Sequence, residues 1–470
     1  MFKSLDRYNG EILVFLLSVS WLTLHWFSVF PALYSWDIFF YLKSIFDFNG
    51  IPGKINWESF LYEVYVYLMA SISTRLTLAT FFQILLFSGL ATKFFSFLKT
   101  DLKMPKLSFL FVVVFILVPP NVYFALMTER DNLFAWSGFL GLLLVAKFAL
   151  KNNQQNVFSD YLKLFAIFAI MVAFRKDALL ILIALPVLFF HLKKSLNVKN
   201  LSKAYIVTVV VVGGYSWFTA QLSRDQEIGI GQKYNISATL SSFLYIFAKE
   251  KDTLSMEDQK FLFSFIKSDL ISSPERALFL NIGEFDKIDK VDELERIHSM
   301  AIKAIIQHPL LFLESRILVF RPYFTTPMFV SPLASSGKNK FAFAYNLHIL
   351  KKYNLISENI LPHFNFLTKP YFYHSHNKDS FLFMISNPIY ILIFTILCGF
   401  YFVRSALAGT LAMMSLLHAG VIFFLQPGGG VKYLYFSYMA IFLIIPVLIY
   451  EVRKKREASK AVENLTPTNT

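Results

Sequence analysis

Charged residues are scarce in this sequence. Asp, Glu, Lys and Arg make up 16% of its 470 residues, whereas a soluble chain has about 25%. Hydrophobic residues reach 56%, and the 54 phenylalanines are spread over all the apolar segments. These proportions exclude a soluble globular protein and predict an all-α integral membrane protein that crosses the bilayer many times.

Cysteine is nearly absent, because Cys398 is the only one. A lone thiol excludes an intramolecular disulfide, and its position in an apolar segment carries no information about the redox compartment. Internal repeats and heptad arrays are also lacking, and residues 221–380 do not show the alternation typical of strands. Repeat proteins and coiled coils are therefore excluded, and no sheet is predicted in that region.

Positive charge is in excess, with a net charge of +14. A basic chain suggests nucleic acid as a partner, but here the basic residues stand in short segments between apolar runs and in the C-terminal Arg453-Lys454-Lys455-Arg456. This is the positive-inside pattern of membrane proteins. It argues against a nucleic-acid partner, predicts contact with membrane lipid, and places both termini in the cytoplasm.

The apolar runs predict about ten transmembrane helices, roughly seven in residues 1–220 and roughly three in residues 381–452. They are expected at residues 12–33, 76–97, 107–126, 132–145, 164–174, 179–190, 204–220, 384–402, 406–425 and 431–450.

Three further regions complete the predicted organisation. Residues 38–48 and 57–72 are amphipathic and rich in Tyr and Phe, which predicts interfacial helices on the outer surface. Residues 221–380 are more polar and predict a mainly helical extracytoplasmic domain, in which Ser255 to Asp258 has the pattern of a capping box. Residues 453–470 are predicted to form a cytoplasmic tail.

Asp37, just after the first predicted span, is the main candidate for chemistry. A carboxylate in an apolar setting is costly and tends to be kept for catalysis or for pairing. The alternative is that Asp37 only caps the helix predicted at residues 38–48, because Asp is a good N-cap.

Other charged groups are predicted at the same face of the membrane. Acids together with bases suit a phosphate leaving group held by Arg and Lys, with a carboxylate that takes a proton from an acceptor hydroxyl. For any single cation among them the alternative is anchoring at the interface. These groups are Glu129, Arg130, Asp131, Arg175, Lys176, Asp177, Arg321 and Lys432.

The order of these features resembles the GT-C superfamily of polytopic glycosyltransferases. The resemblance rests on a long first span followed by Asp37 and two interfacial helices, an acidic outer turn Glu129-Arg130-Asp131, an Arg-bearing third outer turn, and a large loop before the last spans. Residues 228–237, 254–258 and 307–310 further resemble a bacterial branch of this superfamily. This sequence differs in having a single acid, Asp37, at the first motif.

The resemblance implies an inverting hexosyl- or pentosyltransferase of the bacterial cytoplasmic membrane, with a GT-C-like fold and its active site on the extracytoplasmic face. It would move a sugar from a polyprenyl-phosphate donor to a hydroxyl of a glycan, lipid or protein during modification of the cell envelope.

The same resemblance assigns roles to individual residues. Asp37 would be the general base, while Glu129 and Asp131 would orient the acceptor or bind a divalent cation, the one cofactor considered. Arg175 and Lys176 would bind the phosphate, which the pair Lys432-Tyr433 would also face. Arg130 and Arg321 are further candidates for substrate and phosphate binding, because of their charge at the same membrane face.

Two other functions share these features. A flippase or transporter of lipid-linked glycans would also be polytopic and cationic, but is expected to carry charges or helix breaks in mid-span, often in paired halves. An O-antigen-type polymerase or ligase has large outer loops with Arg and uses lipid-phosphate chemistry. The early Asp37 and the short acidic second turn favour the single-sugar transferase.

Overall fold

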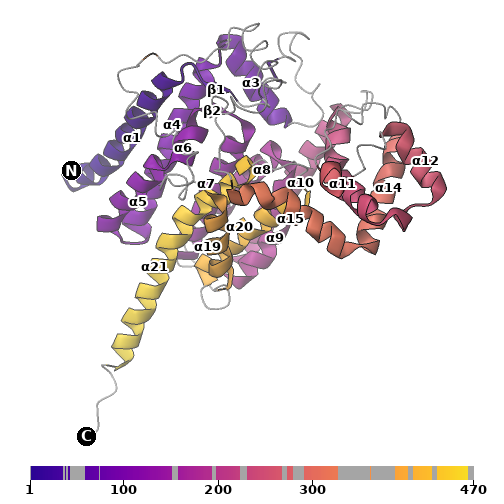
Figure 1. Cartoon of the computed structure of the whole chain (residues 1–470). Coiled ribbons are helices and arrows are strands. Elements are labelled where there is room, and N and C mark those ends of the chain that lie inside the picture. The colour runs from indigo at the N-terminus through magenta and orange to yellow at the C-terminus, as the bar shows by residue number, and fades with distance from the viewer. Residues whose placement is uncertain are drawn as a thin grey trace.

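The computed structural model describes residues 2–34, 38, 41–42, 59–73, 75–150, 157–192, 197–222, 230–266, 273–278, 291–325, 360, 387–400, 406–425 and 431–463. Within these ranges the chain is almost entirely helical (Figure 1). Six helices in the described part of the chain are long and apolar enough to cross a membrane, or up to seven if one bent pair forms a single span. The chain is an all-α membrane protein.

The six helices contain most of the predicted spans. They are α1 (Phe2–Ser28), α4 (Thr77–Ser96), α7 (Arg130–Leu150), α10 (Val198–Leu222), α20 (Ala406–Leu425) and α21 (Tyr435–Glu463). The segments predicted at 164–174, 179–190 and 384–402 fall in the shorter helices α8 (Phe158–Phe174), α9 (Leu179–His191) and α19 (Pro388–Phe400). The count of about ten spans therefore stays a prediction.

A second group of helices lies beside the bundle in Figure 1. It consists of α11 (Ile230–Lys249), α12 (Met256–Phe265), α13 (Pro274–Leu278) and α14 (Val291–Gln307). These helices share their own small hydrophobic core, which is separate from the large core of the bundle. α15 (Pro309–Thr325) packs on α11 and α14 and also on α19 and α20, so it connects the two groups.

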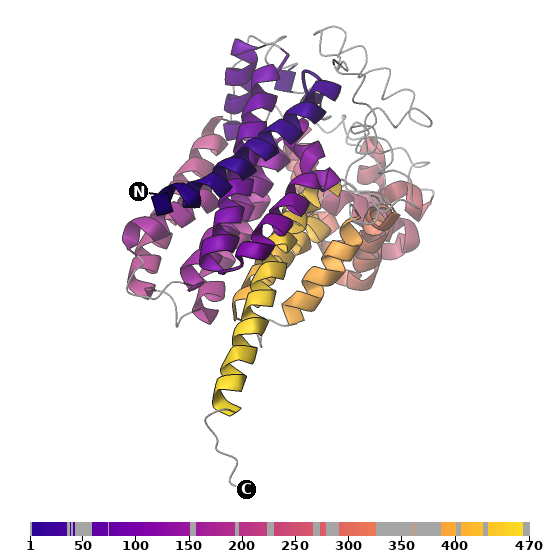
Figure 2. The same ribbon diagram turned by 90° about the vertical axis from the view of Figure 1, so that its left-hand side faces the viewer.

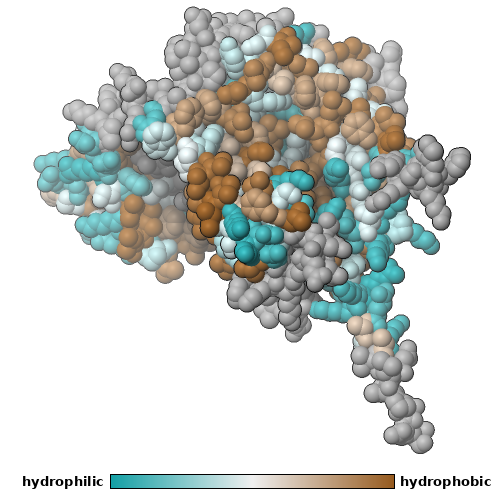
Figure 3. All heavy atoms as spheres, turned by 180° about the vertical axis from the view of Figure 1, so that it is seen from behind, coloured by the Kyte–Doolittle hydropathy of each residue, from teal (hydrophilic) through white to brown (hydrophobic). Residues whose placement is uncertain are grey.

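The surface divides in the same way. Seen from behind, hydrophobic residues gather over the bundle, whereas hydrophilic residues gather on the second helix group and on the far end of α21 (Figure 3). That end of α21 extends beyond the other helices in both ribbon views (Figures 1 and 2). It carries Arg453, Lys454, Lys455 and Arg456, all exposed.

The segment predicted as one span at 107–126 is divided into α5 (Pro105–Leu117) and α6 (Pro119–Leu126), which meet at 57°. Pro119 and Pro120 have no N–H, so the carbonyls of Phe115 and Ile116 lose their helical donors. The side chain of Asn121 replaces one of them, because its Nδ2 donates to the Phe115 carbonyl at 2.6 Å. Every residue of α6 is buried, so the irregular backbone lies inside protein, where it is tolerated.

A pair of two-residue strands joins the first helix to the segment after α6. β1 (Leu33–Tyr34) and β2 (Met127–Thr128) run parallel, with Tyr34 opposite Thr128. Because parallel strands point the same way, their carboxyl ends meet at one edge. Glu129 follows β2 directly, and Asp37 is the third residue after β1 in the sequence.

Glycines let α7 approach its neighbours closely. A Cβ atom on Gly138 would lie 2.5 Å from Cε2 of Phe436 on α21 and 2.9 Å from Cε of Met171 on α8. A Cβ atom on Gly141 would lie 2.9 Å from Cζ of Phe168, also on α8. Any side chain at these positions would separate helices that now touch.

Candidate functional site

A buried, ion-paired cluster forms where three helix ends meet. Arg175 caps the end of α8, Asp177 lies in the short helix η3 (Lys176–Ala178) before α9, and Asp131 lies in the first turn of α7. The side chain of Arg175 is 5% exposed, that of Asp131 2% and that of Asp177 11%. A helix N-terminus favours a carboxylate such as Asp131.

The guanidinium of Arg175 bridges the two carboxylates. Its Nε donates to both oxygens of Asp177 at 3.1 Å, and its Nη2 donates to Oδ2 of Asp177 at 2.6 Å. Its Nη1 donates to Oδ1 of Asp131. The cluster thus connects residues that lie 44 positions apart in the chain, and two turns that the sequence predicted at one membrane face are joined.

Two aromatic rings pack against the same guanidinium. Cζ of Arg175 lies 4.6 Å from the ring centre of Tyr433 and 5.5 Å from that of Phe134. Tyr433 belongs to η11 (Val431–Leu434), directly before α21, so a third predicted segment reaches the site. Rings at these distances stabilise a cation, more so where water is excluded.

Both partners in the turn after α8 stay ionised. Burial by itself raises the pKa of Asp177, but the charge and hydrogen bonds of Arg175 outweigh burial, so this pKa lies below its ordinary value. Burial lowers the pKa of Arg175, and the charges of Asp131 and Asp177 more than reverse that, so this pKa lies above its ordinary value. The cluster consists of ionised side chains that each need a partner of opposite charge, because they are buried.

His418 is a site residue that the sequence analysis missed. It lies on α20, is fully buried, and packs its ring 4.9 Å from that of Phe134 and 5.3 Å from that of Phe436. Neither ring nitrogen has a hydrogen-bond partner among the described residues. Electrostatic interactions connect it to Asp177, Arg175 and Asp131. The only sequence signal was a lone histidine in an apolar run.

The other predicted residues differ in burial and in their relation to this cluster. Glu129 is buried one residue before α7, and Arg130 is half-buried and repels Arg175 electrostatically, so both belong to the site. Lys176 and Arg321 are exposed. Arg321 follows Phe320, whose ring packs 4.9 Å from that of Phe423 near the end of α20.

Two predicted residues lie wholly or partly outside the described part of the chain. Asp37 lies outside the described residues. Lys432 lies in η11, but its side chain is outside the described part of the chain.

The end of α8 is also hydrogen-bonded to the start of α3 (Phe60–Ile72). This helix lies within residues 57–72, where the second interfacial helix was predicted. Ser59, the N-cap of α3, accepts a hydrogen bond from the N–H of Tyr62 and donates one to the carbonyl of Ala173. Tyr215 of α10 donates to the same carbonyl at 3.4 Å. Ala173 stands two residues before Arg175, so these contacts fix the backbone that carries it. Glu63, buried in the first turn of α3, was also missed.

Arg316 is a second buried arginine that the sequence did not reveal. It is fully buried on α15, and its Nε donates to the carbonyl of Phe423 at 2.7 Å. The helical donor for that carbonyl would be residue 427, which is a proline and has no N–H. Arg316 therefore completes the end of α20.

An apolar cavity of about 340 Å³ lies between α1 and α5. Its lining is almost entirely hydrophobic and includes Leu17, Trp21, Val112 and Ile116. Its walls are the helices that lead to β1 and, through α6, to β2. Its apolar lining suits a hydrocarbon chain.

The described residues contain no group of three or more His, Cys, Asp and Glu side chains arranged to hold a metal ion. What they do contain is a polytopic helical bundle with ionised side chains buried at helix ends. Comparison of the chain with known protein families, with curated proteins and with solved structures finds no match.

Proposed function

We propose that this protein is a glycosyltransferase of the bacterial cytoplasmic membrane. It moves a sugar from a polyprenyl-phosphate donor to a hydroxyl of an envelope glycan, lipid or protein at the extracytoplasmic face. The observation that supports this most is the bridge from Arg175 to Asp131 and Asp177 beside Tyr433. It joins Asp131 to Arg175, two residues that the resemblance to the GT-C superfamily had assigned to one site.

The paired strands support a place for Asp37 in the same site. β1 and β2 end side by side, and Glu129 to Asp131 follow β2. Asp37 follows β1 within a few residues of chain, and a residue spans at most about 3.6 Å. The base of the proposed reaction is therefore within reach of the acidic turn.

The proposed roles follow from charge and burial. Asp37 takes the proton of the acceptor hydroxyl as the oxygen attacks the anomeric carbon, and the phosphate leaves on the opposite side, which inverts the configuration. Glu129 and Asp131 orient the acceptor. Basic residues at the site neutralise the phosphate, and the apolar cavity between α1 and α5 takes the polyprenyl chain.

The first test is Asp37→Asn. Asn caps a helix about as well as Asp but cannot accept the proton, so transfer should fall by roughly 10²- to 10⁴-fold. Asp160→Asn is the control, because Asp160 stands in the first turn of α8 and is ion-paired with Lys163.

The measurement is sugar transfer in liposomes by equal amounts of folded protein, with donor and acceptor chosen from the mass difference between envelope glycans with and without the gene. Activity of Asp37→Asn within about threefold of wild type, less than about 1 kcal/mol of barrier, would refute the catalytic role and leave Asp37 as a helix cap.

One observation favours a second function, the flipping of lipid-linked glycans. The bent pair α5–α6 is a broken span or a re-entrant segment, and such breaks are typical of transporters. A flippase moves a labelled lipid-linked sugar across the liposome membrane without transferring the sugar. Translocation in the absence of any acceptor, unaffected by Asp37→Asn, would favour this function over transfer.

A further inference from the structure

Arg175 is not free to bind a phosphate in the arrangement described. A guanidinium holds a phosphate most firmly by two parallel N–H bonds from one edge. The edge formed by Nε and Nη2 of Arg175 is already taken by the carboxylate of Asp177. If the donor phosphate of the proposed reaction binds there, Asp177 has to be displaced.

A displaced Asp177 needs a new partner, because an unpaired carboxylate is costly where water is excluded. His418 is the group available. It is fully buried, both its ring nitrogens lack partners among the described residues, and it interacts electrostatically with Asp177. Phe134 packs against both the His418 ring and the Arg175 guanidinium, so the two groups share one neighbour.

We propose that His418 is a proton-binding residue that takes over Asp177 when a lipid-linked phosphate binds Arg175. The phosphate replaces Asp177 on Nε and Nη2, and Asp177 accepts a hydrogen bond from the imidazole of His418. The imidazole takes one proton from water and becomes an imidazolium. This inference rests on the proposed function, because it assigns the donor phosphate to Arg175.

The charges balance in this exchange. Asp131, Arg175 and Asp177 together carry one net negative charge before binding. A phosphodiester donor adds one negative charge and His418 adds one positive charge, so the net charge of the buried cluster does not change. Without the proton, the cluster would carry an additional uncompensated charge, which is costly away from water.

Other charged and titratable groups surround His418 in the bundle. The charged groups that interact with it electrostatically are Asp177, Arg175 and Asp131. Further titratable residues on the elements packed against α20 include Arg130, Lys176, Tyr245, Lys249, Glu314, Arg316, Arg321, Tyr390, Cys398, Lys432, Tyr433, Tyr435 and Tyr438.

The experiment measures binding of a polyprenyl methyl phosphodiester to the full-length protein in nanodiscs. This probe keeps one negative charge throughout the pH range, so its own ionisation does not contribute. Uptake of one proton makes binding to the wild type about tenfold weaker for each unit by which pH rises between the pH at which His418 titrates in the free protein and the higher pH at which it titrates in the complex. Calorimetry in buffers of different ionisation enthalpy should report about one proton taken up per lipid bound.

Three variants sharpen the test. His418→Gln should bind without proton uptake and with affinity independent of pH. Asp177→Asn should also bind the probe without pH dependence, because no displaced carboxylate then needs His418 as a partner. A merely structural role of His418 would not predict this result. His25→Gln is the control, since His25 is also buried in an apolar helix but bonds to the carbonyl of Trp21; it should keep the wild-type pH dependence.

The outcomes separate this inference from the proposed function. Binding by His418→Gln with the proton uptake of the wild type would overturn the role of His418 and leave the glycosyltransferase proposal intact. Failure of the folded wild type to bind the probe at any pH would overturn the phosphate site, and with it both proposals.

Discussion

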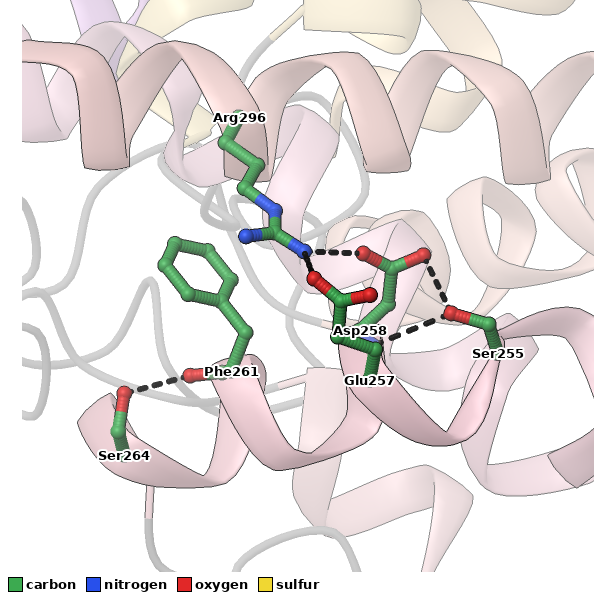
Figure 4. A network of polar contacts seen from close by, with 6 residues as sticks. All are labelled: Ser255, Glu257, Asp258, Phe261, Ser264 and Arg296. Atoms are coloured by element: carbon green, nitrogen blue, oxygen red, sulfur yellow. Dashed lines mark hydrogen bonds and ion pairs between the residues drawn. The ribbon is translucent and has the colours of Figure 1, made fainter.

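Arg175 in the bundle and Arg296 in the second helix group are each held between two carboxylates and against an aromatic ring. Nη2 of Arg296 lies 2.9 Å from Oδ1 of Asp258 and 3.3 Å from Oε1 of Glu257 (Figure 4). Its guanidinium lies 4.2 Å from the ring centre of Phe261. The two arrangements differ in burial, because the side chain of Arg296 is 41% exposed and that of Arg175 5%.

Burial decides what the same set of groups does. In water an ion pair gains little over its hydrated parts and is screened by salt, so Arg296 mainly links α14 to α12. In the bundle no water replaces a lost partner, so removing either member leaves an unpaired charge. The two networks contain the same kinds of residue. Exposure to water makes that of Arg296 a surface contact, whereas burial makes that of Arg175 a candidate site.

The largest effect should come from removing the guanidinium. Arg175→Met removes the positive charge between the two buried carboxylates Asp131 and Asp177 and should lower the free energy of unfolding by about 3–5 kcal/mol. Arg296→Met should change it little, since its partners become hydrated. Unfolding in detergent or nanodiscs measures both.

A combined variant checks the reason for that difference. Adding Asp131→Asn and Asp177→Asn to Arg175→Met removes the uncompensated charges and should recover part of the lost stability. Equal effects of Arg175→Met and Arg296→Met would contradict the distinction drawn from burial.

Acid should separate the two networks to a smaller extent. The pKa of Asp177 and that of Asp258 both lie below the ordinary value, the first because Arg175 outweighs burial and the second because of its hydrogen bond from Arg296. A lowered pKa means that the carboxylate contributes stability above its unfolded pKa of about 3.9 and loses it as pH falls through the folded value.

The stability of the wild type should therefore decline below about pH 4. Asp177→Asn should flatten this decline clearly, and Asp258→Asn only slightly, because Asp258 is better hydrated. Unfolding curves recorded from neutral to acidic pH give the comparison. A stronger flattening by Asp258→Asn would contradict this expectation, because the more exposed carboxylate would then contribute more to stability than the buried one.

The smallest effects should come from the helix caps that accompany the two networks. Ser255 caps α12 as the sequence predicted, accepting from the N–H of Asp258 at 3.2 Å and donating to its carboxylate at 2.9 Å. Ser255→Ala should cost about 1 kcal/mol. Ser59→Ala should cost more, because Ser59 also donates to the carbonyl of Ala173, and unfolding in the same detergent compares them. A larger loss of stability in Ser255→Ala than in Ser59→Ala would contradict the contribution expected from the hydrogen bond between Ser59 and Ala173.

The sequence predicted the elements better than the contacts between them. Apolar runs located α4, α7, α20 and α21, and charges at their ends pointed to Asp131 and Arg175 as candidates. Periodicity does not tell which helix ends meet, so the bridge between these two residues was not predicted. The break before α6 had a visible signal, Pro119-Pro120, whose meaning depended on the side chain of Asn121 filling the lost bond.

Other parts of the site had no usable signal. A two-residue strand is too short for alternation, so β1 and β2 were not predicted. His418 and Arg316 each stand alone among apolar neighbours in the sequence, and their importance appears only from what surrounds them in space.

The close approach at Gly138 has a genetic consequence. Alanine there would meet Phe436, whose ring also contacts His418 and Phe134. A defect caused by Gly138→Ala should therefore be suppressed by a smaller residue at position 436, without any change of charge. Positions 138 and 436 are expected to vary together among related chains, so a screen for suppressors of Gly138→Ala would identify residues that shape the site and leave its chemistry untouched.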